Sequence, residues 1–176
     1  MNSEFRIQNS ESQKLAVVAL GSNLGNSRQI IPVAMVRLQT FSSRPILKSS
    51  LWQTSPVNCP PGSRIFLNAV VGLTTRTGET PESLFQKLRE LETEFGRQMK
   101  KVLNEPRPLD LDLIAFGMET RDSPELILPH PRALVRRFVL QPLAEIAPEL
   151  VLPGQSRTVS QLLAGLPDGE TVTRLS

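Results

Sequence analysis

Two aspartates stand one residue apart in the segment PRPLDLDLIAF, residues 106–116. The flanking residues are mostly apolar, which indicates a strand that enters a core. Side chains two apart on a strand point to the same side, so Asp110 and Asp112 would lie next to each other. Their mutual repulsion and their removal from water must be compensated. Such a pair suits Mg²⁺, which completes its shell with waters and substrate phosphates. The alternative is a solvent-facing edge strand whose acids pair with lysine or arginine.

Basic side chains surround this pair along the chain: Arg97, Arg107, His130, Arg132 and Arg136. We expect Arg132 and Arg136 to lie one turn apart on a helix, with His130 near its N-terminus, where backbone N–H groups favour anions. Acids for a cation and guanidinium groups for an oligophosphate would suit phosphoryl-type transfer, which depends on positioning and charge stabilisation. Each basic residue alone would be read as a solvated surface charge.

A second set of residues could recognise a flat ring. Phe66 and Asn68 lie two apart on an expected strand and would therefore share one side. A ring stacked on Phe66, with the amide of Asn68 at its edge, would be a sensible recognition set. The alternative is that Phe66 belongs to the core and Asn68 ends a strand.

The elements that must position these residues alternate between strands and helices. Apolar patterning and turn signals predict strands at 15–23, 45–54, 65–75 and 109–116, helices at 27–41, 80–95, 133–141 and 158–164, and an extended segment at 125–132. We expect Pro142 to end the third helix. The order β-α-β-β-α-β predicts an α+β fold, a ferredoxin-like sheet with helices packed on one face and C-terminal helical additions. Residues 1–14 read as a flexible extension and 15–176 as a single domain.

Composition and absent motifs exclude several classes of protein. The chain of 176 residues has a net charge of +3, one cysteine, one histidine and no tyrosine. Cys59 alone excludes an internal disulfide framework and fits the cytoplasm. There is no P-loop, no Rossmann glycine motif and no zinc motif, and no apolar run could cross a membrane. Few aromatic residues argue against an RNA-binding sheet, although a basic nucleic-acid binder stays the weakest alternative. We expect a cytoplasmic monomer that binds neither membrane nor nucleic acid.

Ordered blocks between about Leu15 and Pro153 resemble the 6-hydroxymethyl-7,8-dihydropterin pyrophosphokinase family of the folate pathway. These blocks are ALGSNLG (19–25), WQTSPV (52–57), FLNAVV (66–71), LETEFGR (91–97), PRPLDLDL (106–113) and LPHPR…RRFVLQPLAEIAPEL (128–150). The resemblance implies transfer of the terminal diphosphate of ATP to the hydroxymethyl group of the pterin, with release of AMP.

The resemblance also implies roles for individual residues. Asp110 and Asp112 would be catalytic and hold two Mg²⁺ ions with ATP, and Arg97 would assist catalysis. Glu92 would be an acid at the edge of the site. The implied ATP-binding residues are Arg107, Leu113, His130, Arg132 and Arg136. The implied pterin-binding residues are Thr54, Pro56, Val57, Phe66, Asn68 and Phe138.

Three positions depart from the pattern of that family. Met99 stands where a second arginine is usual, and Asn104-Glu105 replace Trp-Gly. A lost arginine removes bidentate phosphate contacts. The alternative function is therefore a catalytically impaired homologue that binds a pterin or a nucleotide. We also expect residues 98–106 to be mobile without ligand and to close over ATP.

Overall fold

The computed structural model describes residues 13–55, 65–97 and 106–175, and its main feature is one antiparallel sheet. The sheet has the order β5-β1-β4-β3-β8, and β2 also pairs with β4. The strands are β1 (Leu15–Ser22), β2 (Leu47–Lys48), β3 (Trp52–Thr54), β4 (Phe66–Thr74), β5 (Asp110–Phe116) and β8 (Val172–Arg174). Strands β6 (Arg121–Asp122) and β7 (Ile127–Leu128) form a separate hairpin. The first four elements of the sheet path reproduce the ferredoxin-like order, so the predicted fold class is confirmed.

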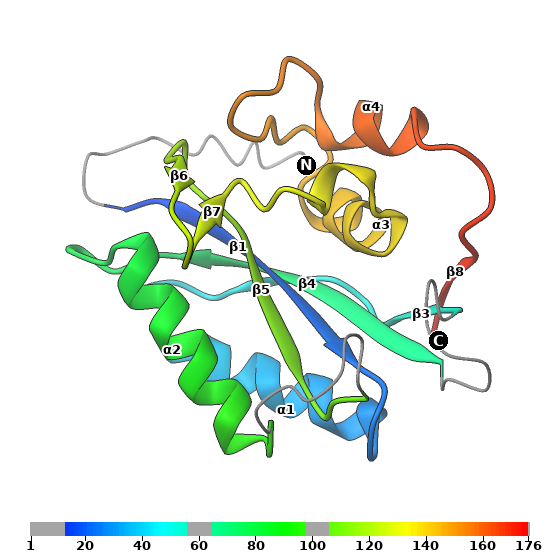
Figure 1. The fold of residues 1–176 in the computed structure, drawn as a ribbon, viewed down its shortest axis with the longest axis horizontal. Coiled ribbons are helices and arrows are strands. Elements are labelled where there is room, and N and C mark those ends of the chain that lie inside the picture. Colours follow the sequence, from blue (N-terminus) through cyan, green and yellow to red (C-terminus); the bar gives the residue numbers. More distant parts are fainter. Residues whose placement is uncertain (1–12, 56–64, 98–105, 176) are drawn as a thin grey trace.

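Helices cover both faces of the sheet (Figure 1). Helices α1 (Ser27–Gln39) and α2 (Pro81–Glu94) pack on one face. The 3₁₀ turn η1 (Ala133–Val135) and helices α3 (Arg137–Ile146) and α4 (Val159–Ala164) lie on the other. The expectation of helices on one face is therefore incomplete, because the C-terminal additions cover the second face.

The alternation of side chains along the strands divides the core into two layers. On β1, Val18 and Leu20 pack toward α1 and α2, whereas Val17 and Ala19 pack toward α3 and α4. On β5, Leu111 faces the first layer, so its neighbours Asp110 and Asp112 must face the second. The aspartates consequently lie on the face that carries the C-terminal helices.

Helix α2 forms as the sequence predicts. The Thr80 hydroxyl accepts a hydrogen bond from the Ser83 amide, and Pro81 occupies the first turn. Leu84, Leu88 and Leu91 make a buried stripe. This helix positions Glu92, which is fully buried.

The segment after β7 differs from the prediction. Arg136 has an extended backbone, with φ −112° and ψ 110°, and α3 begins only at the next residue. Arg132 and Arg136 are therefore not one turn apart on a single helix. Pro142 lies inside α3, where its missing N–H costs one helical hydrogen bond. Burial of neighbours such as Val139 and Leu143 offsets that loss.

The structure connects the end of the expected N-terminal extension to the domain. Lys14, which was assigned to the flexible extension, donates its backbone N–H to Thr75 Oγ1 at 2.9 Å and pairs with Glu119. Residues 1–12 of that extension lie outside the described residues, as do Pro56, Val57, Cys59 and the expected mobile loop apart from Pro106. Among the described helices, none is both long and apolar enough to span a bilayer. The monomeric state and the cytoplasmic location stay predictions.

Candidate active site

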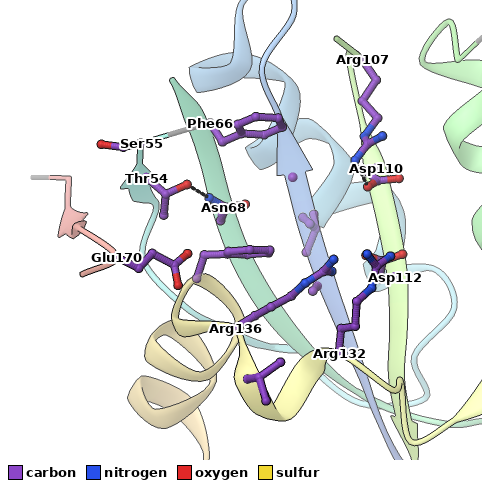
Figure 2. Close-up of a pocket in the computed structure, with 15 residues that line it drawn as sticks. Thr54, Ser55, Phe66, Asn68, Arg107, Asp110, Asp112, Arg132, Arg136 and Glu170 are labelled. Atoms are coloured by element: carbon purple, nitrogen blue, oxygen red, sulfur yellow. Dashed lines mark hydrogen bonds and ion pairs between the residues drawn. The ribbon is translucent and has the colours of Figure 1, made fainter. Parts of the chain in front are cut away.

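A cavity of about 380 Å³ opens between the sheet and the segment that leads into α3. Figure 2 shows two groups of side chains on opposite sides of it, the acids and Arg107 on one side and Thr54 and Asn68 on the other. Nine of the predicted site residues line it, namely Thr54, Phe66, Asn68, Arg107, Asp110, Asp112, Arg132, Arg136 and Phe138. Residues far apart in the sequence therefore meet in one place.

The two aspartates have different partners. Asp110 Oδ1 pairs with Arg97 Nη1 at 2.9 Å, and Asp110 Oδ2 pairs with Arg107 Nη2 at 2.8 Å. Asp112 forms no ion pair or hydrogen bond with the described part of the chain. Arginines thus compensate one carboxylate, and the other faces the cavity with its charge available to a cation.

Arg107 is held between the acid and the loop after β1. Its backbone N–H donates to Asn23 Oδ1 at 3.0 Å, and the Asn23 N–H donates back to the Arg107 carbonyl at 3.3 Å. Its Nε atom is buried and has no hydrogen-bond partner in the described structure. An unpaired buried donor on a cation is costly, so this position favours an anionic ligand.

Glu92 connects α2 to the start of β5. Its carboxylate accepts hydrogen bonds from the Leu111 N–H at 2.7 Å and from Arg89 Nη1 at 2.9 Å, and it also pairs with Arg97. Burial raises the pKa of Glu92, while the Leu111 N–H and the two arginines oppose that rise. Arg97 lies between Glu92 and Asp110, so the buried acid orients a side chain that touches the site.

The side of the cavity formed by the segment before α3 is cationic. The Arg136 guanidinium lies 5.3 Å from the centre of the Phe138 ring. Burial lowers the pKa of Arg136, and Arg132 adds to that effect. Arg132 approaches from the same segment (Figure 2). Among the described residues no acid forms an ion pair with either arginine, so a bound polyanion would stabilise these two guanidinium groups.

His130, two residues before Arg132, is not among the residues that line the cavity. Its backbone N–H donates to the Ile114 carbonyl at 2.8 Å, and its Nδ1 accepts from the Arg132 N–H at 3.3 Å. Burial lowers the pKa of His130; Arg136 and Arg132 act in the same direction, and Asp112 opposes them. The imidazole is therefore neutral near pH 7, and the bond at Nδ1 leaves Nε2 as its N–H donor.

The opposite side of the cavity combines aromatic and amide groups. Asn68 Nδ2 donates to Thr54 Oγ1 at 2.8 Å, and both side chains are buried. This bond fixes the amide in place and leaves its Oδ1 as an acceptor. Phe66 and Phe138 come from different elements and line the same cavity. Such walls suit a flat heterocycle with polar edges.

Strand β1 forms the floor between the two sides. Gly21 pairs with Asn68 on β4 and with Asp110 on β5, and Ala19 pairs with Asp112. A Cβ atom at Gly21 would lie 3.4 Å from Asn68 Oδ1 and 4.0 Å from Asp110 Cβ. Small residues here keep the cavity deep between its two ends.

Some sequence predictions fall elsewhere. Leu113 does not line the cavity, because its side chain packs into the core toward α1 and α2, on the face opposite the aspartates; its expected role in ATP binding stays a prediction. Arg97 does not line the cavity and reaches the site only through Asp110. Sequence reasoning missed Ser55, Val135 and Glu170. Ser55 directly follows the predicted residue Thr54. Glu170 lies in the C-terminal tail, where no sequence motif indicated a site.

The donor set agrees with magnesium rather than zinc. Within the described residues, no three His, Cys, Asp or Glu side chains form a group that could hold a metal ion by themselves. The pair Asp110 and Asp112 offers hard oxygen ligands beside guanidinium groups, which fits an ion that shares its shell with waters and phosphate oxygens.

Comparison with known proteins adds independent information. A family model described as 7,8-dihydro-6-hydroxymethylpterin-pyrophosphokinase (HPPK) matches residues 17–148. The 2-amino-4-hydroxy-6-hydroxymethyldihydropteridine pyrophosphokinase of Pseudomonas aeruginosa is 38% identical over 151 residues, which cover 85% of this chain and 90% of that protein. The protein of the same name from Synechocystis is 37% identical over 148 residues, covering 84% of this chain and 74% of the relative.

Larger proteins also match. The folic acid synthesis protein fol1 of Pneumocystis carinii is 32% identical over 95% of this chain, and this chain spans only 22% of its length. A crystal structure of wild-type Plasmodium falciparum HPPK-DHPS with pteroate aligns with a TM-score of 0.66 and 15% identity, over 86% of this chain and 42% of that one. The structural match, at this identity, supports the fold alone.

Proposed function

Because the chain belongs to the 7,8-dihydro-6-hydroxymethylpterin-pyrophosphokinase family, we propose that it transfers the diphosphate of ATP to the hydroxymethyl group of 6-hydroxymethyl-7,8-dihydropterin. AMP is the second product, and the reaction belongs to folate biosynthesis. The observation that carries the proposal is the single cavity with an acid pair and arginines at one end and an amide between aromatic rings at the other. Such a cavity can hold a phosphate chain against a flat ring.

The pterin occupies the end lined by Phe66, Asn68 and Phe138 in this proposal. The rings of Phe66 and Phe138 supply apolar contact for a flat heterocycle. Asn68, fixed by its bond to Thr54, offers a carbonyl oxygen to an N–H group of the ring. This arrangement directs the hydroxymethyl group along the floor toward the aspartates.

The triphosphate of ATP occupies the other end. Arg107, whose buried Nε has no partner, and the pair Arg132 and Arg136 supply donors for its oxygens. His130 does not line the cavity, so its expected contact with ATP rests on the family resemblance alone. Magnesium, bound by Asp110 and Asp112 together with the phosphates, would supply further charge neutralisation on the phosphate oxygens.

The chemical step is a displacement at phosphorus. The hydroxyl oxygen of the pterin forms a bond to the β-phosphorus, the bond from that phosphorus to the α-phosphate oxygen breaks, AMP leaves, and the hydroxyl proton passes to solvent. Arginine side chains stabilise negative charge on the transferred group and on the departing phosphate. The remaining work of the chain is to align the two substrates and to exclude water.

The test is formation of AMP from MgATP and the reduced hydroxymethylpterin. We expect Asp112→Asn to lower turnover by about 100-fold or more, since it removes a charge aimed at the reacting phosphates. Its fold should persist, because Asp112 makes no bond with the described residues and repels Asp110. The matched control is Asp122→Asn, an exposed acid on β6, which should keep full activity.

The outcomes separate the two candidate functions. AMP formation by the wild-type chain supports the pyrophosphokinase. Pterin binding in a calorimeter without AMP at millimolar substrates would instead identify the impaired homologue, which the sequence departures at Met99, Asn104 and Glu105 favour. Unchanged turnover in Asp112→Asn would refute the role of the acid pair.

A further inference from the structure

The C-terminal tail brings into the cavity an acid that lies outside the sequence blocks with the family resemblance. Glu170 lies between α4 and β8 and lines the cavity. The tail is anchored at this point, because Arg137 Nη2 donates to the carbonyls of Leu166 and Pro167, each at 3.3 Å. Glu170 Oε2 accepts a hydrogen bond from the Arg137 backbone N–H at 2.9 Å, in the first turn of α3.

The second carboxylate oxygen of Glu170 has no such partner. Oε1 is buried and accepts no hydrogen bond in the described structure. A buried acceptor without a donor costs free energy, and more so on an acidic group. The bonds of Arg137 to the tail and to Oε2 fix the position of the carboxyl group. Oε1 is therefore held at the cavity as an acceptor without a donor.

The position of the unused oxygen indicates which ligand it serves. Figure 2 shows Glu170 on the same side of the cavity as Thr54 and Asn68, away from Asp110, Asp112 and Arg107. In the described chain, only two buried side-chain atoms lack a partner, and both belong to residues that line this cavity. One is the donor Arg107 Nε at the anion-binding end, and the other is the acceptor Glu170 Oε1 at the ring-binding end. A ligand with an anion at one end and N–H donors at the other would satisfy both.

We propose that Glu170 is a substrate-binding residue whose Oε1 accepts a hydrogen bond from an N–H group of the heterocycle. The inference rests on the proposed function, since a pterin carries an exocyclic amine next to a ring N–H. An acidic acceptor forms a charge-assisted bond with such donors. Glu170 therefore selects rings that carry an amino group over rings with a carbonyl oxygen in its place, because a carbonyl would leave two acceptors facing each other.

A purely structural role for Glu170 predicts different behaviour. If the residue only capped α3 through Arg137, any side chain with an acceptor would replace it. Glu170→Gln separates the two roles, because the amide oxygen keeps the bond to the Arg137 N–H while the NH₂ group replaces the unused acceptor with a donor. Asp168→Asn is the matched control, since it removes one exposed acid from the same tail.

The experiment measures the affinity for the pterin by calorimetry and the KM values for pterin and ATP in the AMP assay. We expect Glu170→Gln to weaken pterin binding and to raise its KM by about tenfold or more, with the KM for ATP and the thermal midpoint unchanged. An analogue with oxygen in place of the amino group should bind weakly to the wild type and lose no further affinity in the variant. Asp168→Asn should behave as wild type throughout.

Three results would overturn the inference, and they are distinguishable. If the wild type forms AMP and Glu170→Gln retains its pterin affinity, Glu170 does not bind the substrate, and the proposed function stands. If the wild type binds no pterin and forms no AMP, the proposed function fails and the inference fails with it. Equal discrimination against the oxo analogue by wild type and Glu170→Gln would also reject the role in selection.

Discussion

Removal of the buried carboxylate of Glu92 should destabilise the fold and the site together. Glu92 is fully buried and accepts from the Leu111 N–H at 2.7 Å, where β5 begins. It also pairs with Arg89 and with Arg97, and Arg97 in turn contacts Asp110. One side chain thus joins α2, β5 and the acid pair.

The loss in the free energy of unfolding depends on which buried groups each substitution leaves without a partner. In Glu92→Ala, the Leu111 N–H loses its acceptor and the mostly buried Arg97 loses one of its two acids, which together cost about 3–5 kcal/mol. The pair with Arg89 adds little, because that side chain is 40% exposed. Glu92→Gln keeps an acceptor for Leu111 but loses the charge, so we expect a cost of about 1–2 kcal/mol.

Urea denaturation followed by circular dichroism would measure these values from the midpoint and slope of each transition. Glu94→Gln on the same helix is the control, because Glu94 is half exposed and its one ion pair among the described residues is with Arg37; it should change the free energy of unfolding by less than about 0.5 kcal/mol. Turnover should fall in Glu92→Gln, since Arg97 loses its anchor. If both Glu92 variants unfold like the control, the network does not contribute to stability and the reasoning is wrong.

Three further perturbations test other parts of the site. Thr54→Val leaves the buried Asn68 Nδ2 without its acceptor, so pterin affinity in a calorimeter should fall several-fold, at a cost in stability of about 1–3 kcal/mol. His130→Gln should flatten the pH dependence of the free energy of unfolding: the folded His130 has a pKa below its ordinary 6.5, so its contribution is present above that value and is lost as the pH falls through the folded pKa. Gly21→Ala places its Cβ in ordinary contact distance of Asn68 Oδ1 and Asp110 Cβ, so the thermal midpoint should hold while the calorimetric affinities for pterin and ATP both fall.

Each of these has a contrary outcome. Thr54→Ser retains a hydroxyl, so equal loss of pterin affinity in Ser and Val variants would show that the hydrogen bond to Asn68 is not the cause. His130 is the only histidine in the chain, so an unchanged slope between pH 5.5 and 7.5 in His130→Gln would contradict the lowered pKa. Wild-type affinities in Gly21→Ala would mean that neither substrate lies against the floor.

The strand pattern made much of the fold predictable, and the reason is periodicity. Alternation along β5 requires Asp110 and Asp112 to share a face, and Leu111 to occupy the other, whatever the surrounding topology. The same argument applies to Phe66 and Asn68 on β4. Helix α2 was predictable because its cap and apolar stripe are local signals.

Contacts that depend on tertiary packing were not predictable. Pro142 was expected to end a helix, yet the packing of α3 on the sheet keeps it inside one. The extended backbone at Arg136 reflects the start of α3 at the next residue. No local signal in the sequence marks that start, because the helix has no side-chain cap. Glu170 reaches the cavity only because β8 pairs with β3 and returns the tail to the sheet. A short strand of three residues gives too weak a pattern to predict such a return.

The glycine in the floor has a consequence for how this architecture can diversify. Gly21 stands directly between Asn68 and Asp110 in the hydrogen-bonded ladder, so those two residues are separated by two strand spacings, roughly 10 Å. No exchange of side chains alters that interval, because backbone hydrogen bonds determine it. The sheet therefore keeps the distance between the two ends of the cavity constant. Relatives with this framework can change the residues that bind a ligand at each end, but a substrate with a longer link between its ring and its hydroxyl group would place that hydroxyl beyond the acids.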